Sequence, residues 1–178
     1  MTTSEQTLAT GSWDLDTAHS AVHFAVRHLG ISKIRGRFNT FETRFVVDES
    51  GAAAIEATIH LDSFDTGNAQ RDGHVRGADL LDVDARPTLT FKATEPVRVT
   101  ERFQVTGEVT LGKVSKPITL DVEWGGIEEF HDGRRHAGFT ATGSLARTEL
   151  DVGAALPTAV LSDKIDIELD IQILEPQN

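Results

Sequence analysis

Hydrophobic and polar residues alternate with a period of two along most of the chain. The clearest example is KIDIELDIQILE, residues 164–175, where Ile or Leu takes every second position from Ile165 to Ile173 and Asp, Glu or Gln fills the positions between. Successive side chains of a β-strand point to opposite faces, so this spacing predicts a strand with one apolar and one polar face. The spacing does not fit a helical period.

The same alternation recurs along the chain and predicts a set of about eight strands. Short turn sequences, Asp48–Gly51, Gly112–Lys113 and Asp132–Gly133, separate neighbouring segments in the manner of hairpins. The other alternating segments are residues 19–26, 34–47, 53–63, 87–99, 103–112, 115–125 and 136–146.

One segment, TGNAQRDGHVRGADLLDVDAR, breaks the alternation. Its polar spacing with Ala and Leu predicts a short helical insertion around residues 66–82, with Asn68 or Asp65 as the N-cap. Residues 1–11 are polar and are expected to form a loose tail. Residues 12–178 contain no interior linker or repeat, so they are expected to form a single domain.

Antiparallel strands that are apolar on one face close into a barrel or stack as a sandwich. The predicted apolar face carries small residues, Gly107, Ala137, Ala141 and Gly143, beside Phe and Trp. Such a face would leave a cavity, whereas a filled sandwich core would contain more Leu and Ile. The sequence therefore favours an all-β fold, an antiparallel β-barrel with an internal cavity.

Composition narrows the classes of function. Lys and Arg number 17 against 28 Asp and Glu, a formal charge of −11, which disfavours binding to nucleic acid or to anionic lipid surfaces. The absence of cysteine excludes disulfides, thiolate metal sites and cysteine nucleophiles. No apolar run approaches the roughly 18 residues of a membrane-spanning helix. The polar N-terminus shows no secretion signal, so a cytoplasmic location is expected.

Several motifs resemble the YceI-like, or polyisoprenoid-binding, family. They are W-D-L-D-x-x-H-S at 13–20, V-x-F-x-V-R-H-L-G-I-S-K-I-R-G-R-F at 22–38, S-F-D-T-G-N-A-Q-R-D-G-H-V-R-G-A-D-L-L-D-V at 63–83, P-T-L-T-F at 87–91 and G-E-V-T-L at 107–111. The resemblance covers about residues 12–175. Two positions depart from the family pattern: Arg86 stands where an aromatic is usual, and R-T-E-L-D at 147–151 replaces an arginine, acidic, aromatic, glycine sequence.

The resemblance implies a lipocalin-like barrel whose elongated interior holds a long-chain isoprenoid or similar amphiphilic lipid. It implies non-catalytic binding, storage or transport, with a bound isoprenoid or quinone-like ligand and no resident cofactor or metal. A homodimer is also implied. Burying roughly 600 Å² of prenyl chain would contribute on the order of 15 kcal/mol gross, so an apolar tunnel suffices without catalysis.

Apolar candidates for the ligand site lie on the predicted inner face. For any one of them, plain core packing is the alternative, because a barrel's core and its tunnel share one face. Phe41 is an odd number of residues from Phe38, so either a bend lies between them or Phe38 faces elsewhere. The candidates are Phe24, Phe38, Phe41, Phe91, Leu111, Trp124 and Phe139.

Polar candidates cluster in the predicted helical insertion. Arg71, His74 and Arg76 together suit a diphosphate or quinone headgroup. The alternative is a solvated helix face, on which Asp72 and Arg76 form an i, i+4 pair. His28, followed by Gly30, is a further candidate at the barrel mouth.

Two other functions are alternatives to non-catalytic lipid binding. A haem or metal protein would use His28 and His74, although His19 and His23 on one strand would stand about 13 Å apart, too far for one ion. An enzyme acting on a lipid-like substrate could use Asp72 and His74 as acid and base. Ser20 and His19, as neighbours on a strand, would face opposite sides and form no dyad, and no G-x-S-x-G or phosphate-binding motif is present.

Overall fold

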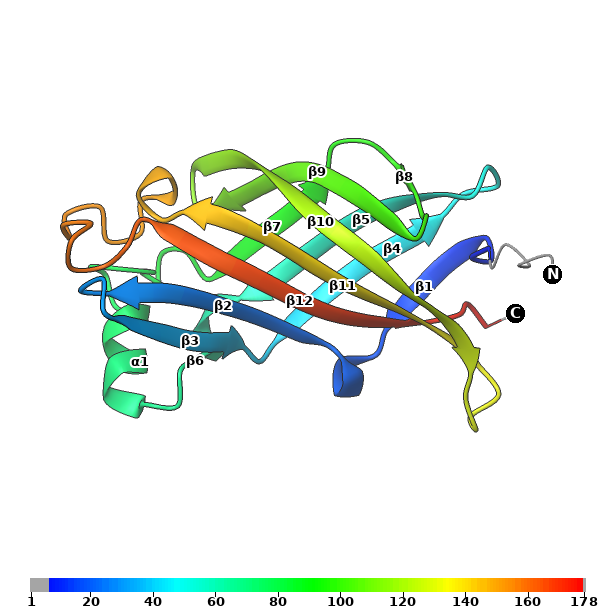
Figure 1. The fold of residues 1–178 in the computed structure, drawn as a ribbon, viewed down its shortest axis with the longest axis horizontal. Coiled ribbons are helices and arrows are strands. Elements are labelled where there is room, and N and C mark those ends of the chain that lie inside the picture. The colour runs from blue at the N-terminus through cyan, green and yellow to red at the C-terminus, as the bar shows by residue number, and fades with distance from the viewer. Residues whose placement is uncertain (1–6, 178) are drawn as a thin grey trace.

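The first strand, β1, pairs with β4 and not with β2, and the last strand, β12, returns to β1. The computed structural model describes residues 7–177. The hydrogen-bonded order β1-β4-β5-β7-β9-β10-β11-β12 closes on itself because β12 also pairs with β1, with Leu15 opposite Ile173. The result is a closed, eight-stranded antiparallel β-barrel, drawn out along its strands (Figure 1), which confirms the predicted fold class.

The strands and helices have the following bounds: β1 (Gly11–Leu15), η1 (Thr17–His19), β2 (Ala21–His28), β3 (Ser32–Phe38), β4 (Phe41–Val47), β5 (Ala52–His60), η2 (Leu61–Ser63), β6 (Phe64–Asp65), α1 (Ala69–Arg76), β7 (Thr88–Ala93), β8 (Val97–Arg98), β9 (Arg102–Leu111), β10 (Val114–Glu129), β11 (Arg135–Ala146), η3 (Thr148–Leu150) and β12 (Lys164–Leu174). The predicted hairpin turns join β4 to β5, β9 to β10 and β10 to β11.

Three neighbouring strand positions are each divided into two strands, and the two-residue β8 pairs with β5 outside the ring, which is why twelve strands make a ring of eight. The 3-10 turns η1 and η2 separate β1 from β2 and β5 from β6, and residues 39–40 separate β3 from β4. β2, β3 and β6 then continue the wall, with β2 on β12. Ser63 stabilises the break, since the amides of Asn39 and Thr40 donate to its carbonyl (3.2 Å) and hydroxyl (3.0 Å). This is the bend between Phe38 and Phe41, and both side chains face inward.

The single α-helix of residues 7–177, α1, lies at one end of the barrel beside the β2–β3 turn and the loop before β12 (Figure 1). Its N-cap is Asn68, one of the two predicted, whose Oδ1 accepts from the Arg71 amide at 2.9 Å. Asp72 is buried and accepts from the Thr66 amide and hydroxyl, which fixes the helix against the segment after β6. Within the described part of the chain, no helix is long and apolar enough to span a membrane.

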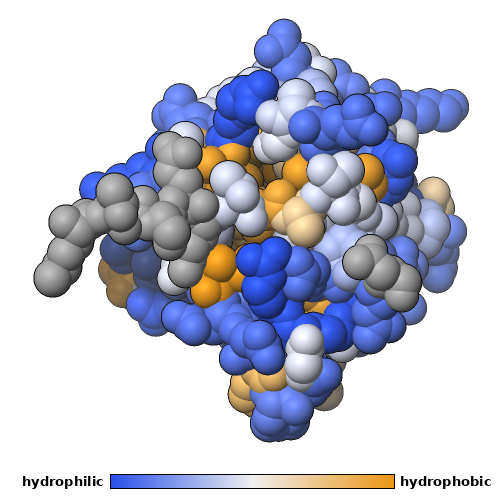
Figure 2. Space-filling model, turned by 90° about the vertical axis from the view of Figure 1, so that its right-hand side faces the viewer, coloured by the Kyte–Doolittle hydropathy of each residue, from blue (hydrophilic) through white to orange (hydrophobic). Residues whose placement is uncertain are grey.

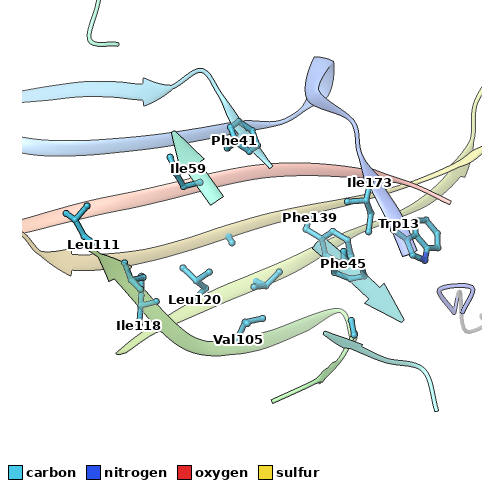
Figure 3. Packing of buried hydrophobic residues seen from close by; sticks show 14 of the residues in the cluster. Trp13, Phe41, Phe45, Ile59, Val105, Leu111, Ile118, Leu120, Phe139 and Ile173 are labelled. Carbon is cyan, nitrogen blue, oxygen red and sulfur yellow. The ribbon is translucent and has the colours of Figure 1, made fainter. Parts of the chain in front are cut away.

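At the opposite end, where both termini emerge (Figure 1), side chains of several strands are fully buried. Trp13, Val47, Ala53, Ala137 and Ile173 are each at most 1% exposed. Figure 3 shows Trp13 and Ile173 on the same side of the cluster as Phe45 and Phe139, with Leu111 and Ile118 toward the other side. From outside, this end is mostly polar, with apolar side chains showing near its centre (Figure 2).

Of the small residues predicted on the inner face, Ala141 lines the cavity, whereas the two glycines do not leave open space. A Cβ on Gly107 would overlap the Phe91 ring, and one on Gly143 would meet a Leu120 methyl at 2.8 Å. These strand glycines are therefore filled by large neighbours, and the cavity has another origin. Of the predicted tail, residues 1–6 lie outside the described part of the chain, and Gly11 already belongs to β1.

Candidate functional site

A cavity of about 810 Å³ runs inside the barrel. Its wall is almost entirely aliphatic and aromatic, because each strand turns every second side chain inward. The wall reaches Phe45, Phe139 and Ile173 but includes none of Trp13, Val47 or other residues packed beyond them. The cavity is therefore blocked at the end with the termini and extends toward α1.

Most of the predicted site residues meet on this wall. The three rings of Phe24, Phe38 and Phe64 pack together with centroids 5.2–5.7 Å apart, and they cover the wall where the strands are interrupted. Phe64 was not singled out from the sequence because it lies in a two-residue strand without clear alternation. The predicted residues on the wall are Phe24, His28, Phe38, Phe41, Arg71, His74, Phe91, Leu111 and Phe139.

Two predicted residues do not line the cavity. Trp124 stacks behind Phe139, with centroids 6.4 Å apart, next to the register shift between Trp124 and Gly126. Arg76 instead donates from Nη2 to the Phe64 carbonyl. It cannot share the Arg71 face, because residues five apart on a helix are rotated by about 140° about its axis.

The α1 end of the cavity is polar. Arg71 donates from Nε to the Thr66 hydroxyl (2.7 Å) and from Nη2 to the Thr66 carbonyl (3.1 Å). These bonds hold the guanidinium at the wall, and its Nη1 makes no hydrogen bond within residues 7–177. His74 lies one helical turn further along the same wall. An apolar tunnel with an arginine and a histidine at one end suits an amphiphile.

Arg147 organises the loop between β11 and β12, residues 147–163, and the sequence analysis did not identify this role. It is 1% exposed, and its guanidinium donates to five backbone carbonyls of that loop. Asp163 accepts from the Thr148 hydroxyl (2.6 Å) and amide (3.0 Å), and these hydrogen bonds lower the pKa of Asp163. The only sequence signal for this role is the position of Arg147, directly before a segment that lacks alternation.

Arg86 ties this loop to the segment after α1. Its guanidinium donates to the carbonyls of Leu80 and Leu81 on one side and of Leu150 and Asp151 on the other. This position is one of the two departures from the family pattern. The planar guanidinium of Arg86 carries several N–H donors and satisfies these four carbonyls at once, which explains the role of an arginine at this position.

His19 and its neighbour Ser20 contact different partners. His19 lies in η1, not on a strand as the sequence analysis assumed, and its Nδ1 is 2.8 Å from an oxygen of Asp16. The hydroxyl of its neighbour Ser20 bonds the backbone of Gln172, so the two do not act on each other. Within residues 7–177, no three His, Asp or Glu side chains are grouped to hold a metal ion.

Comparison with known proteins agrees with this architecture. The model of the YceI-like domain matches residues 13–173. The chain belongs to the YceI-like family. A UPF0312 protein of Vibrio parahaemolyticus is 37% identical to this YceI-like chain over 162 residues, covering 89% of the chain and 84% of that protein. A UPF0312 protein of Enterobacter is 34% identical, with 89% and 83% covered.

Solved structures share the YceI-like barrel. The Campylobacter jejuni YCEI protein is 28% identical with a TM-score of 0.75, covering 85% of this chain and 90% of that one. Burkholderia cenocepacia BcnA superposes with a TM-score of 0.78 at 22% identity, covering 89% and 99%. A polyisoprenoid binding domain from Saccharophagus degradans gives 0.69 at 18% identity, covering 94% and 100%. The last two likenesses establish the fold alone.

Proposed function

We propose that this YceI-like protein binds a long-chain isoprenoid or similar amphiphilic lipid in its barrel, as a non-catalytic carrier or store. The observation that carries the proposal is the cavity of about 810 Å³, apolar along its length, blocked at one end and polar at the other. This volume lies in the upper part of the range of roughly 300–1,000 Å³ usual for ligand sites. Its shape and lining suit one chain with one polar head.

The energetics favour a chain over a compact ligand. Burial of apolar surface contributes about 25 cal/mol per Å², so roughly 600 Å² of prenyl chain gives on the order of 15 kcal/mol before ordering costs. Away from the α1 end, Thr43 and His23 are the polar strand side chains on the wall, so a bound chain desolvates few polar groups. Binding then needs neither a metal nor a reactive group.

The head of the lipid is placed at α1 under this proposal. Arg71 and His74 are basic groups on the wall there, beside His28 and an Arg147 whose guanidinium is already bonded to backbone carbonyls. The Nη1 of Arg71, which makes no hydrogen bond within residues 7–177, suits an anionic or carbonyl oxygen. A diphosphate, a monophosphate or a quinone shares this acceptor chemistry. The polyisoprenoid binding domain from Saccharophagus degradans has the same fold, which supports the choice of an isoprenoid chain.

The first test asks whether the purified protein carries a lipid. We expect organic extraction followed by mass spectrometry to recover one chemically unaltered prenyl lipid per chain. A Leu169→Trp variant, which fills the cavity from the middle of β12, should lose it, whereas Thr142→Trp on the exposed outer face of β11 should keep it. An empty protein that takes up no added prenyl lipid would contradict binding, and recovery of a converted lipid would contradict a non-catalytic role.

The second test concerns the head. Arg71→Ala should weaken binding of a prenyl diphosphate by about tenfold or more relative to the matching prenyl alcohol, because a charge-assisted hydrogen bond is lost. Arg76→Ala is the matched control on the same helix, since Arg76 does not line the cavity. Equal losses for diphosphate and alcohol in Arg71→Ala would remove Arg71 from the headgroup site.

A further inference from the structure

The turn between β2 and β3 exposes large apolar side chains where folding does not require them. Ile31 is 82% exposed and Leu29 is 51% exposed. Leu29 also has a positive φ of 55°, followed by Gly30 at 68°. A tight hairpin turn of this kind favours Asn-Gly, and a leucine in the left-handed region costs roughly 1–2 kcal/mol. An exposed, strained leucine is better explained by a function than by stability.

The loop before β12 lies against this turn and enlarges the apolar surface. The Leu29 amide donates to the Val160 carbonyl at 2.8 Å, and His28 forms a β-bridge with Leu161. Val160 is itself 36% exposed. Residues 152–162 contain no charged side chain. Leu29, Ile31 and Val160 are here called the apolar tip.

The apolar tip adjoins the cavity. His28 and Ile34, which flank the turn, line the cavity wall, and so do Val160 and Leu161 of the loop. The surface therefore continues from the outside of the molecule into the tunnel at the same end as Arg71 and His74. A lipid that enters or leaves at this end passes beside the apolar tip.

The hairpin beneath the tip is basic in a strongly acidic protein. Residues 27–37, RHLGISKIRGR, hold four of the 17 Lys and Arg residues and no Asp or Glu. Arg27 and Lys33 are cross-strand partners on the exposed outer face, and neither forms an ion pair within residues 7–177. Like charges placed directly opposite each other destabilise a hairpin, so their pairing also calls for an anionic partner.

Acidic residues flank the half of the hairpin away from the tip. Asp65 is the strand partner of Arg37, and Asp166 lies opposite Ala25, the strand partner of Arg35. Arg27 and Lys33, which pair with each other nearer the tip, therefore carry the local positive charge. Asp163 is engaged by Thr148. The overall charge of −11 thus does not prevent a local attraction.

We propose that the apolar tip and the basic β2–β3 hairpin dock the barrel on an anionic lipid bilayer, with Leu29 and Ile31 inserted at the level of the headgroups. Apolar side chains next to lysine and arginine match the two parts of an anionic membrane surface. Docking in this orientation would set the cavity mouth against the bilayer. That consequence rests on the proposed lipid-binding function, whereas the docking itself does not.

Vesicle sedimentation with the full chain tests the proposal. We expect binding to phosphatidylcholine vesicles containing about 30% phosphatidylglycerol at least tenfold tighter than to pure phosphatidylcholine, with the difference shrinking at high salt. Leu29→Asn with Ile31→Thr should abolish binding while the Asn-Gly turn preserves the hairpin. Phe130→Ser removes an exposed ring from the β10–β11 turn at the other end, and should bind unchanged.

The charge contribution has its own matched pair. Arg27→Gln with Lys33→Gln should weaken binding about 30-fold, since each basic residue near an anionic surface contributes roughly fivefold. Arg44→Gln with Lys92→Gln gives the same net charge from exposed positions on β4 and β7, and should change binding less than twofold. Equal effects of the two pairs, or equal binding to both vesicle types, would overturn the proposal.

Two further readouts separate the alternatives. Light scattering after size exclusion would reveal a dimer that Leu29→Asn with Ile31→Thr dissociates, and this result would assign the tip to a second copy instead of a membrane. Uptake of a prenyl alcohol from detergent should be unchanged in the hairpin variants. If neither the wild type nor any variant takes up prenyl alcohol but vesicle binding is intact, the proposed lipid-binding function is contradicted and docking stands. If prenyl alcohol is taken up but vesicles are not bound, docking is contradicted and the proposed function stands.

Discussion

At the end that carries the termini, the barrel is filled by side chains of its own strands. Trp13, Ala137 and Ile173 come from β1, β11 and β12, and none is more than 1% exposed. At the α1 end, by contrast, the loop of residues 147–163 and the segment after α1 cover the cavity, held by arginines bonded to backbone carbonyls. We expect the first closure to belong to the cooperative core and the second to open locally with the barrel intact.

The largest effect is expected from truncation at the filled end. Trp13→Ala should lower the free energy of unfolding by about 3–5 kcal/mol, because it removes a buried indole and leaves a cavity among strands that cannot collapse. Leu156→Ala, in the loop at the α1 end, should cost under about 1.5 kcal/mol since its side chain is only partly buried. Chemical denaturation measures both, and similar losses would show that the two ends are equally part of the core.

The next effect is on hydrogen exchange, and it distinguishes the two ends by which amides exchange faster. Arg147→Met should accelerate hydrogen exchange of the amides in residues 148–163, because five carbonyls lose their donor and each buried orphan costs roughly 1–3 kcal/mol. Exchange in β9 to β11 should stay slow. Uniformly faster exchange across all strands would mean that Arg147 supports the whole barrel and that the loop is not a separable unit.

The sequence predicts the strands well because alternation is a local property. The odd spacing of Phe38 and Phe41 leaves a bend as one of two alternatives. The sequence does not decide between them, since the groups that satisfy the break at Asn39 lie on Ser63, more than twenty residues away. Alternation also assigns a residue to a face but not to a level along the barrel. Trp124 therefore looks equivalent to Phe139, although only Phe139 reaches the cavity.

The polar part of the site shows the same limit. Arg71 and Arg76 look like one cluster in the sequence, but helical rotation and the carbonyl of Phe64 separate them. The sequence marks Arg86 and Arg147 only by their positions and not by their role, because their acceptors are backbone atoms of irregular segments. Every residue has a backbone carbonyl, so a pattern of side chains cannot show which carbonyls accept these hydrogen bonds.

A smaller effect depends on pH and again singles out the loop. Hydrogen bonds from Thr148 lower the pKa of Asp163 below its ordinary value of 3.8, so their stabilisation is fully present above that value and is lost as pH falls through the lowered pKa. Asp163→Asn mimics the protonated side chain. Exchange in residues 148–163 should be faster in this variant at about pH 7, and the gap should close in strong acid. A constant gap would show that the charge of Asp163 is irrelevant.

The smallest effect is expected from a residue of the cavity wall between the two ends, and it is a gain of stability instead of a loss. The Thr43 hydroxyl is buried without a hydrogen-bond partner within residues 7–177, and Thr43 lies on the wall. Thr43→Val keeps the side chain's shape and removes the unsatisfied hydroxyl, so it should stabilise the barrel by up to about 1 kcal/mol. Thermal unfolding measures this gain, and Thr142→Val on the exposed face of β11 is the control for β-propensity. A loss of stability in Thr43→Val alone would show that the hydroxyl does find a partner in solution and that the wall is less dry there than the structure indicates.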